Sequence, residues 1–300
     1  MVLSSLAGLA PLLYHDEPSV ETLGYFHHSH PMDGGRRPWR GELASVVEMR
    51  RFGIAFAQKI CSGRTRIDSL LSHSSNPMNN HLSSIDQQIA AKHLLTHPFY
   101  LAWTRGELSK EALTDYARQY YHHVAAFPTY LSAVHAKCDD QPTRKQILSN
   151  LIDEEAGDPN HPELWLQFAE SLGTTRDEVR ATQPQPETTA LIETFRDVCA
   201  NGSTAQGLAA LYSYESQIPT VSESKIDGLK KHYGLTNPKD YEYFSVHMEA
   251  DREHSAAERA MLQEHINDSN APSVNAAVDR VLNALWDLLT GVCQRHAIAC

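Results

Sequence analysis

Residues 112–137 read ALTDYARQYYHHVAAFPTYLSAVHAK, and this stretch decides the fold class. Its apolar and aromatic side chains follow the spacing of a long helix, and Ser109 stands where a helix cap is expected. Runs of alternating β-branched residues, which are typical of strands, are essentially absent here and in the rest of the chain. The pattern therefore predicts helices without a sheet.

Helical signals continue on both sides of this stretch. Upstream, apolar residues between Ile85 and Leu95 fall near one helical face. Downstream, helices are expected over 142–156, 162–172, a short segment opened by the capping box of Thr175 and Glu178, 187–200, 204–218, a segment from Ser222, 238–266 and 273–295. Short connections between so many helices predict an all-α bundle of about seven helices, each burying its apolar stripe against the others.

The first 80 residues differ from the rest of the chain. They contain HHSHPMDGGRRPWRG (27–41) and a polar run at 70–84, and only residues 43–60 look weakly helical. We interpret residues 1–80 as a poorly structured N-terminal extension and residues 81–300 as the folded domain. The histidines of the extension are interpreted as incidental.

Composition excludes several classes of function. With 26 Lys+Arg against 37 Asp+Glu, the formal net charge is -11, which disfavours nucleic acid and anionic membranes as partners. An apolar run of the roughly 18 residues that a membrane span needs is missing, and so is the basic start of a secretory signal. The five scattered cysteines suit a reducing compartment better than a disulfide framework. We predict a cytoplasmic protein.

The sharpest local motif is His247-x3-Asp251-x2-His254. Offsets of four and seven residues return to within about 40° on a helix, so all three side chains project from one face. Two imidazoles and a carboxylate suit Fe, Mn or Zn, and this grouping is typical of non-haem iron. A solvated, charged helix face remains the alternative, because Glu249 and Arg252 lie nearby.

Two further candidates contain carboxylates. Glu154 and His161 are seven residues apart around a Gly-Asp-Pro-Asn break, although the same segment also looks like an ordinary helix end, loop and N-cap. Glu215 lies in the apolar run LAALYSYE, and a buried carboxylate must be paired, protonated or bound to a metal. Together with the motif above, three helices offer three carboxylates and three imidazoles. Helical bundles build carboxylate-rich two-metal centres from such side chains, which indicates a centre that reacts with oxygen.

The region from about residue 85 to the C-terminus resembles the haem-oxygenase-like di-metal oxidases of the TenA/PqqC superfamily, and within them the CADD-like para-aminobenzoate synthases. The resemblance rests on HPFYLAW (97–103), Glu154-x6-His161, LYSYE ending at Glu215, Lys225 in SESKIDGL, and VHMEADREH (246–254). It implies that the metal ligands are Glu154, His161, Glu215, His247, Asp251 and His254. The implied metals are two ions, Fe/Fe or Fe/Mn, with O2 and an external reductant as co-substrates.

The resemblance also implies an unusual reaction. These proteins are thought to make para-aminobenzoate for folate from one of their own tyrosines, with a lysine as the amino donor; the matching residues are Tyr100 and Lys225. Tyr214, next to Glu215, is a candidate for relaying an electron or hydrogen-bonding the centre. From the residues alone, Tyr100 would be a core aromatic and Lys225 a solvated helix lysine beside Lys230.

Two alternatives stay open at this point. The two-metal centre could oxidise an external small molecule, which a wide apolar channel in the bundle would favour. A metal-free TenA- or PqqC-like bundle, or a protein whose main role is to bind a partner, is the other alternative. The complete set of six ligands argues against the metal-free alternative. A homodimer is expected from the fold type, and His122, His123 and His135 are interpreted as structural.

Overall fold

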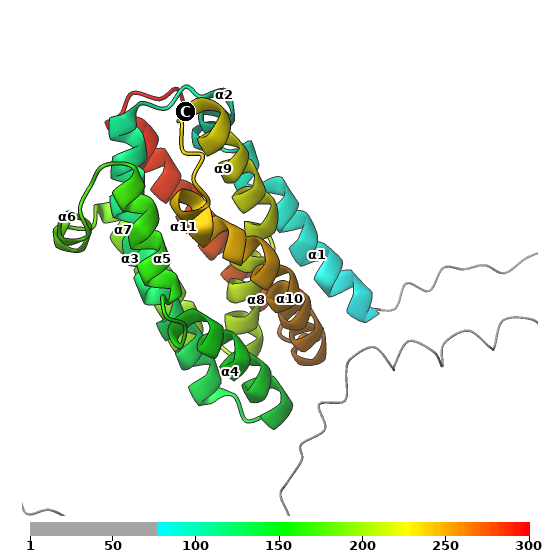
Figure 1. Cartoon of the computed structure of the whole chain (residues 1–300). Coiled ribbons are helices and arrows are strands. Elements are labelled where there is room, and N and C mark those ends of the chain that lie inside the picture. Colours follow the sequence, from blue (N-terminus) through cyan, green and yellow to red (C-terminus); the bar gives the residue numbers. More distant parts are fainter. Residues whose placement is uncertain (1–76) are drawn as a thin grey trace, which may run out of the picture. The chain divides into compact units, whose positions relative to one another are not determined.

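The computed structural model describes the backbone of residues 77–300 and the side chains of residues 81–300. Residues 1–76 of the expected extension, with its weak helix at 43–60, therefore lie outside the described residues, whereas residues 77–80 already belong to the first helix. Within the described part the chain forms eleven α-helices and two short 3-10 helices, without a strand, so the all-α prediction is confirmed (Figure 1). In chain order these are α1 (Pro77–Ala91), η2 (Leu94–Thr96), α2 (Pro98–Arg105), α3 (Lys110–Lys137), α4 (Gln141–Glu155), α5 (His161–Ser171), α6 (Arg176–Ala181), α7 (Pro186–Asn201), α8 (Thr204–Glu215), α9 (Ile218–His232), η3 (Pro238–Tyr241), α10 (Glu242–His265) and α11 (Ala271–Arg295).

The expectation of about seven helices was too low, because short helices are hard to recognise from periodicity. The helix α2 has only eight residues, and over so short a run the spacing of apolar residues does not distinguish a helix from a buried strand. The start expected at Ser222 is also wrong, because α9 begins at Ile218 and Ser222 is buried inside it. Pro219 is tolerated there because N–H groups in the first turn of a helix make no intrahelical hydrogen bond, so the N–H that proline lacks is not needed.

The caps predicted at two other helix starts are confirmed. The side chain of Ser109 accepts a hydrogen bond from the backbone N–H of Ala112 at the start of α3. Thr175 and Glu178 form the reciprocal capping box of α6. Side chains of this kind satisfy backbone donors that the first turn of a helix leaves without partners.

The long helices lie side by side and bury an aromatic core. The helix α3 packs against α7, α10 packs against α8 and α9, and α11 packs against α7 and α8, whereas α6 lies to one side (Figure 1). The largest fully buried side chains include Trp103, Trp165, Tyr100, Tyr116 and Tyr130. A core built from tyrosine and tryptophan brings polar atoms into the interior, and such atoms need partners there.

Close packing between α2 and α9 requires a glycine. A Cβ atom at Gly228 would lie 2.6 Å from Cδ1 and Nε1 of Trp103. The same Nε1 donates a hydrogen bond of 3.3 Å to the backbone oxygen of Lys225. Gly228 thus lets α9 approach α2 closely, and this approach sets Lys225 beside the helix that carries Tyr100.

None of the helices in the described part of the chain combines the length and the apolar character that crossing a lipid bilayer requires.

Candidate metal centre and the buried tyrosine–lysine pair

The structure brings together all six residues predicted as metal ligands, in two groups of three. They come from four helices: α4, α5, α8 and α10. Within each group the potential ligand atoms lie within 4.8 Å of one another, and every member is buried. The first group is Glu154, His161 and His247, and the second is Glu215, Asp251 and His254.

The helical geometry of α10 explains why one segment serves both groups. His247, Asp251 and His254 are all buried on one face, whereas Glu249 and Arg252 between them are exposed. The alternative of a solvated, charged face is therefore wrong for the three motif residues. His247 joins the first group and His254, about two turns further along, joins the second.

In the first group, one carboxylate faces two imidazole rings. Nδ1 of His161 lies 2.9 Å from Oε2 of Glu154, yet the two atoms lack the angles of a hydrogen bond. Nε2 of His247 lies 3.8 Å from Oε1 of the same carboxylate. The other ring nitrogen of His247, Nδ1, is 2.8 Å from the backbone oxygen of Tyr243. Because Nδ1 must carry the hydrogen in that bond, Nε2 is the ring nitrogen of His247 that is left to bind a metal ion.

The second group has a similar arrangement. Nε2 of His254 is 3.0 Å from Oδ2 of Asp153, which leaves Nδ1 facing Oδ1 of Asp251 at 3.4 Å. Asn150 donates from Nδ2 to both oxygens of Glu215, at 3.0 and 3.2 Å. Metal ligands are usually oriented by hydrogen bonds of this kind, in which an outer carboxylate accepts from a histidine or an amide donates to a carboxylate.

Electrostatics differ between the two groups. Burial by itself would raise the pKa of Glu154, but the rings of His161 and His247 outweigh it and lower the pKa to about 2. Burial, followed by the charge of Asp251, raises the pKa of Glu215 to about 7. Burial likewise raises the pKa of Asp251 to about 6. In the second group, two carboxyl groups are therefore crowded around the single imidazole of His254.

Several buried atoms of the two groups lack hydrogen-bond partners. They include both oxygens of Asp251 and Nδ1 of both His161 and His254. Leaving such atoms without partners in the interior is costly, and a metal ion would satisfy them. The nitrogen and oxygen donors suit Fe, Mn or Zn, so the six residues fit a centre for two divalent metal ions.

A second buried site joins α2, α3 and α9. The hydroxyl of Tyr100 is 3.2 Å from the hydroxyl of Tyr116, and Nζ of Lys225 donates a hydrogen bond of 2.7 Å to the same Tyr116 oxygen. The Nζ atom also lies 5.4 Å from the centre of the Tyr100 ring. Tyr116 thus bridges the two residues to which the resemblance assigns the reaction.

The environment of Lys225 is the opposite of a solvated helix surface. Its exposed fraction is 3%, and aromatic rings of five residues surround Nζ: Tyr100, Tyr116, Tyr120, Trp165 and Phe244. Burial lowers the pKa of this amine well below its ordinary value, so its uncharged form is favoured. The expectation of a solvated lysine, drawn from the residues alone, is wrong.

Tyr214 lies between the two sites. Its hydroxyl accepts a hydrogen bond of 2.9 Å from Tyr120, whose ring in turn lies 5.2 Å from that of Tyr116. The hydrogen bond joins Tyr214 to the aromatic cluster around Lys225, while its neighbour Glu215 belongs to the second metal group. Its role as an electron relay stays a prediction.

Comparison with known proteins agrees with this geometry. A family described as iron-containing redox enzymes matches residues 114–286. The chain belongs to this family. It is 47% identical over 210 residues to the 4-aminobenzoate synthase of Chlamydia trachomatis, covering 70% of this chain and 90% of that protein. It is 44% identical over 228 residues to the 4-aminobenzoate synthase of Nitrosomonas europaea, covering 73% and 93%.

The fold of this redox enzyme is also found in solved structures. A domain of unknown function from Shewanella denitrificans, with a heme oxygenase-like fold, superposes with a TM-score of 0.61 at 21% identity, covering 75% of this chain and 95% of that one. The predicted haem-oxygenase-like bundle is therefore confirmed, and so is the prediction of an oxidoreductase.

Sequence reasoning missed several residues that support the redox enzyme's two sites. Asp153 and Asn150 hold a histidine and a carboxylate of the second group, and Tyr116 bridges Tyr100 and Lys225. Asp153 stands next to Glu154, so its position gave a weak signal. Asn150 and Tyr116 have spacings that any buried helix residue shares, and only the packing of distant helices brings them to the sites.

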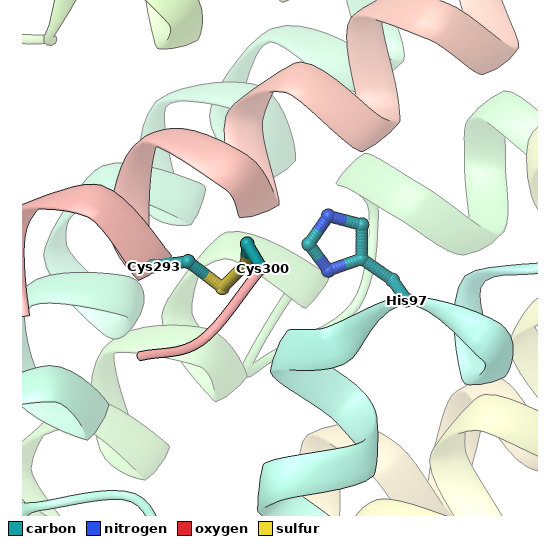
Figure 2. A group of neighbouring side chains, drawn as sticks. All are labelled: His97, Cys293 and Cys300. Carbon is teal, nitrogen blue, oxygen red and sulfur yellow. A yellow bond between two sulfur atoms is a disulfide. The ribbon is translucent and has the colours of Figure 1, made fainter. Parts of the chain in front are cut away.

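A third cluster, His97 with Cys293 and Cys300, lies near the C-terminus (Figure 2). The two sulfur atoms are joined in a disulfide, whereas the scattered cysteines were expected to suit a reducing compartment better than a disulfide framework. Nδ1 of His97 accepts from the backbone N–H of Phe99, and Nε2 is 3.1 Å from the hydroxyl of Thr290. The bond to Phe99 makes His97 the N-cap of α2, the helix that carries Tyr100. Because both ring nitrogens have partners, we interpret this histidine as structural.

Proposed function

We propose that this redox enzyme is an oxygen-dependent di-metal oxidase that forms para-aminobenzoate for folate from its own Tyr100, with Lys225 as the amino donor. The names of the two bacterial relatives support the product, and the family supports iron. The six residues Glu154, His161, Glu215, His247, Asp251 and His254 would hold two metal ions, Fe/Fe or Fe/Mn. When bound, this centre would supply the oxidising power of O2, with electrons from an external reductant.

One observation carries the proposal: the amine of Lys225 is buried 5.4 Å from the centre of the Tyr100 ring, where burial favours its uncharged form. Tyr100 and Lys225 are 1% and 3% exposed, so water and diffusing amines have little access to them. Only the uncharged amine has the lone pair that a new C–N bond needs, and burial favours that form. A lysine placed here for stability alone would be costly, because its polar head finds the single acceptor Tyr116.

The atoms of these two residues account for the product. The ring and Cβ of Tyr100 match the seven carbons of para-aminobenzoate, and Nζ of Lys225 supplies the nitrogen. The C–N bond forms at the ring carbon that carries the hydroxyl, and three bonds break: the C–O bond of Tyr100, the Nζ–Cε bond of Lys225 and the Cα–Cβ bond of Tyr100. The phenol oxygen leaves as water, and O2 is the oxidant that converts Cβ to the carboxyl group. The hydroxyl of Tyr116, between the two, would orient the amine and hold a proton between Nζ and the phenol oxygen.

An isotope experiment tests this proposal. The full chain is produced with ring-¹³C tyrosine and ε-¹⁵N lysine, loaded with Fe(II) with or without Mn(II), and exposed to O2 and a reductant without any substrate. We expect para-aminobenzoate that carries both labels, at no more than about one equivalent per chain, and loss of the Tyr100 side chain in the peptide mass.

Matched variants sharpen the experiment. Tyr100→Phe and Lys225→Gln should abolish the product, whereas Tyr130→Phe, another fully buried tyrosine, and Lys230→Gln on the exposed side of α9 should retain it. Unlabelled product would contradict the self-sacrificing reaction. Oxygen consumption by a metal-loaded protein without any product would instead indicate an external substrate.

A further inference from the structure

A hollow in the protein surface lies directly beside the two metal groups. Its volume is about 610 Å³, and it is formed by the end of α4, the start of α5 and the middle of α10. His161 of the first group and His254 of the second both line it. One opening therefore reaches both groups from solvent.

The carboxylates that line this hollow give it a negative charge. Asp153, Glu249 and Glu253 line it, and the ten side chains around it include neither lysine nor arginine. Glu249 and Glu253 are exposed, and the side chain of Asp153 is 52% exposed. A concave surface with charges of one sign focuses the field and raises the local concentration of oppositely charged ions.

Buried atoms at the bottom of the hollow lack hydrogen-bond partners. Nδ1 of His161 and Nδ1 of His254 have none, and the two residues are only 5% and 6% exposed. Asp153 links the exposed acidic residues to the buried histidines, because its Oδ2 atom is 3.0 Å from Nε2 of His254 while much of its side chain faces water. Acidic side chains at the surface thus lead to two buried imidazoles whose Nδ1 atoms lack hydrogen-bond partners.

We infer that this acidic hollow, defined by Asp153, Glu249 and Glu253 above His161 and His254, is the route by which divalent metal ions reach the centre from solvent. The exposed carboxylates attract the hydrated ion, Asp153 holds it at the inner edge, and the histidines accept it as its water ligands leave. The inference rests on the proposed two-metal centre, but not on the fate of Tyr100.

The decisive test measures the rate of metal loading rather than activity. Full-length metal-free protein is mixed with Co(II), whose visible absorption reports binding to nitrogen and oxygen ligands, and the bound metal is counted at the end. The kinetic phases of the absorption change that belong to the centre are those that Glu154→Ala removes for the first group and Asp251→Ala removes for the second. The test variant is Glu249→Gln with Glu253→Gln, because neither side chain has a hydrogen bond or ion pair within the described part of the chain, whereas Asp153 contacts His254.

The matched control removes the same charge elsewhere. Glu193→Gln with Asp279→Asn changes two exposed acids on α7 and α11, helices that carry none of the six predicted ligands. Neutralising one carboxylate near the path of a divalent ion slows its arrival by about threefold at low salt. We expect the Glu249/Glu253 variant to load about tenfold more slowly than the parent at about 0.01 M salt, and the control to differ by less than about twofold.

Salt and stoichiometry separate the outcomes. The difference should shrink at about 0.3 M salt, where screening is strong, and both variants should still bind two equivalents of metal. A Glu249/Glu253 variant that loads as fast as the control would overturn the inference and leave the two-metal centre standing. A parent protein that binds no metal would overturn the centre itself, and the route with it.

Discussion

Replacing Gly228 with alanine tests the close approach of α9 to α2, which sets Lys225 beside Tyr100. The added Cβ would lie 2.6 Å from the ring of Trp103, which is fully buried and has little room to move. Overpacking of this kind costs about 1–3 kcal/mol. Alanine is favoured over glycine within a helix by about 1 kcal/mol. Because a contact of 2.6 Å places the cost at the upper end, we expect a net destabilisation of about 1–2 kcal/mol.

Thermal and urea unfolding measure this effect. For a chain of this size 1 kcal/mol shifts Tm by about 2–4 °C, so Tm should fall by about 2–8 °C. Asp227→Ala, on the exposed side of the same helix, should stay within about 0.5 kcal/mol of the parent. The yield of para-aminobenzoate should fall as the helices separate, while two metal equivalents remain, because α2 and α9 carry none of the six predicted ligands.

An unfolding free energy equal to or above that of the parent would refute this reasoning. It would mean that Trp103 moves aside at no cost in free energy, and that the higher helix propensity of alanine sets the sign of the change in stability. The contact at Gly228 would then not be what holds Lys225 in position.

Two further perturbations have expected outcomes of known sign. Tyr116→Phe removes the hydroxyl that accepts a hydrogen bond from Lys225. We expect the free energy of unfolding, measured in urea, to fall by about 1–3 kcal/mol and the yield of para-aminobenzoate to fall as well. A yield equal to that of the parent would argue against Tyr116 as the bridge. Without metal, the raised pKa values of Glu215 (about 7) and Asp251 (about 6) stabilise the fold most at low pH, and this contribution is lost as pH rises through those values. The lowered pKa of Lys225 acts on stability in the opposite direction over this range, so the measurement is the difference in Tm between metal-loaded and metal-free protein. Added metal should raise Tm more at pH 8 than at pH 5, because at pH 5 the ion must displace protons from the two carboxyl groups. A metal effect that is larger at pH 5 would contradict this.

Much of the candidate centre could be predicted from the sequence because its spacings are local. The three residues of His247-x3-Asp251-x2-His254 share one face of any helix, so their convergence needs only the helix itself. The all-α class follows from the same kind of periodicity. Short or irregular features were less predictable: α2 was missed, and the start of α9 was placed four residues too late.

The sequence by itself determined which residues could bind metal, since ligand chemistry and helical spacing are written into neighbouring positions. Only the tertiary structure decided that Lys225 is buried rather than solvated, with its uncharged form favoured, that Tyr116 bridges it to Tyr100, and that the six predicted ligands divide into two groups. The physical reason is that burial and pKa depend on helices far apart in the chain. The close contact of α9 with α2 and the packing of α10 against α8 create environments that the periodicity of a single helix cannot reveal.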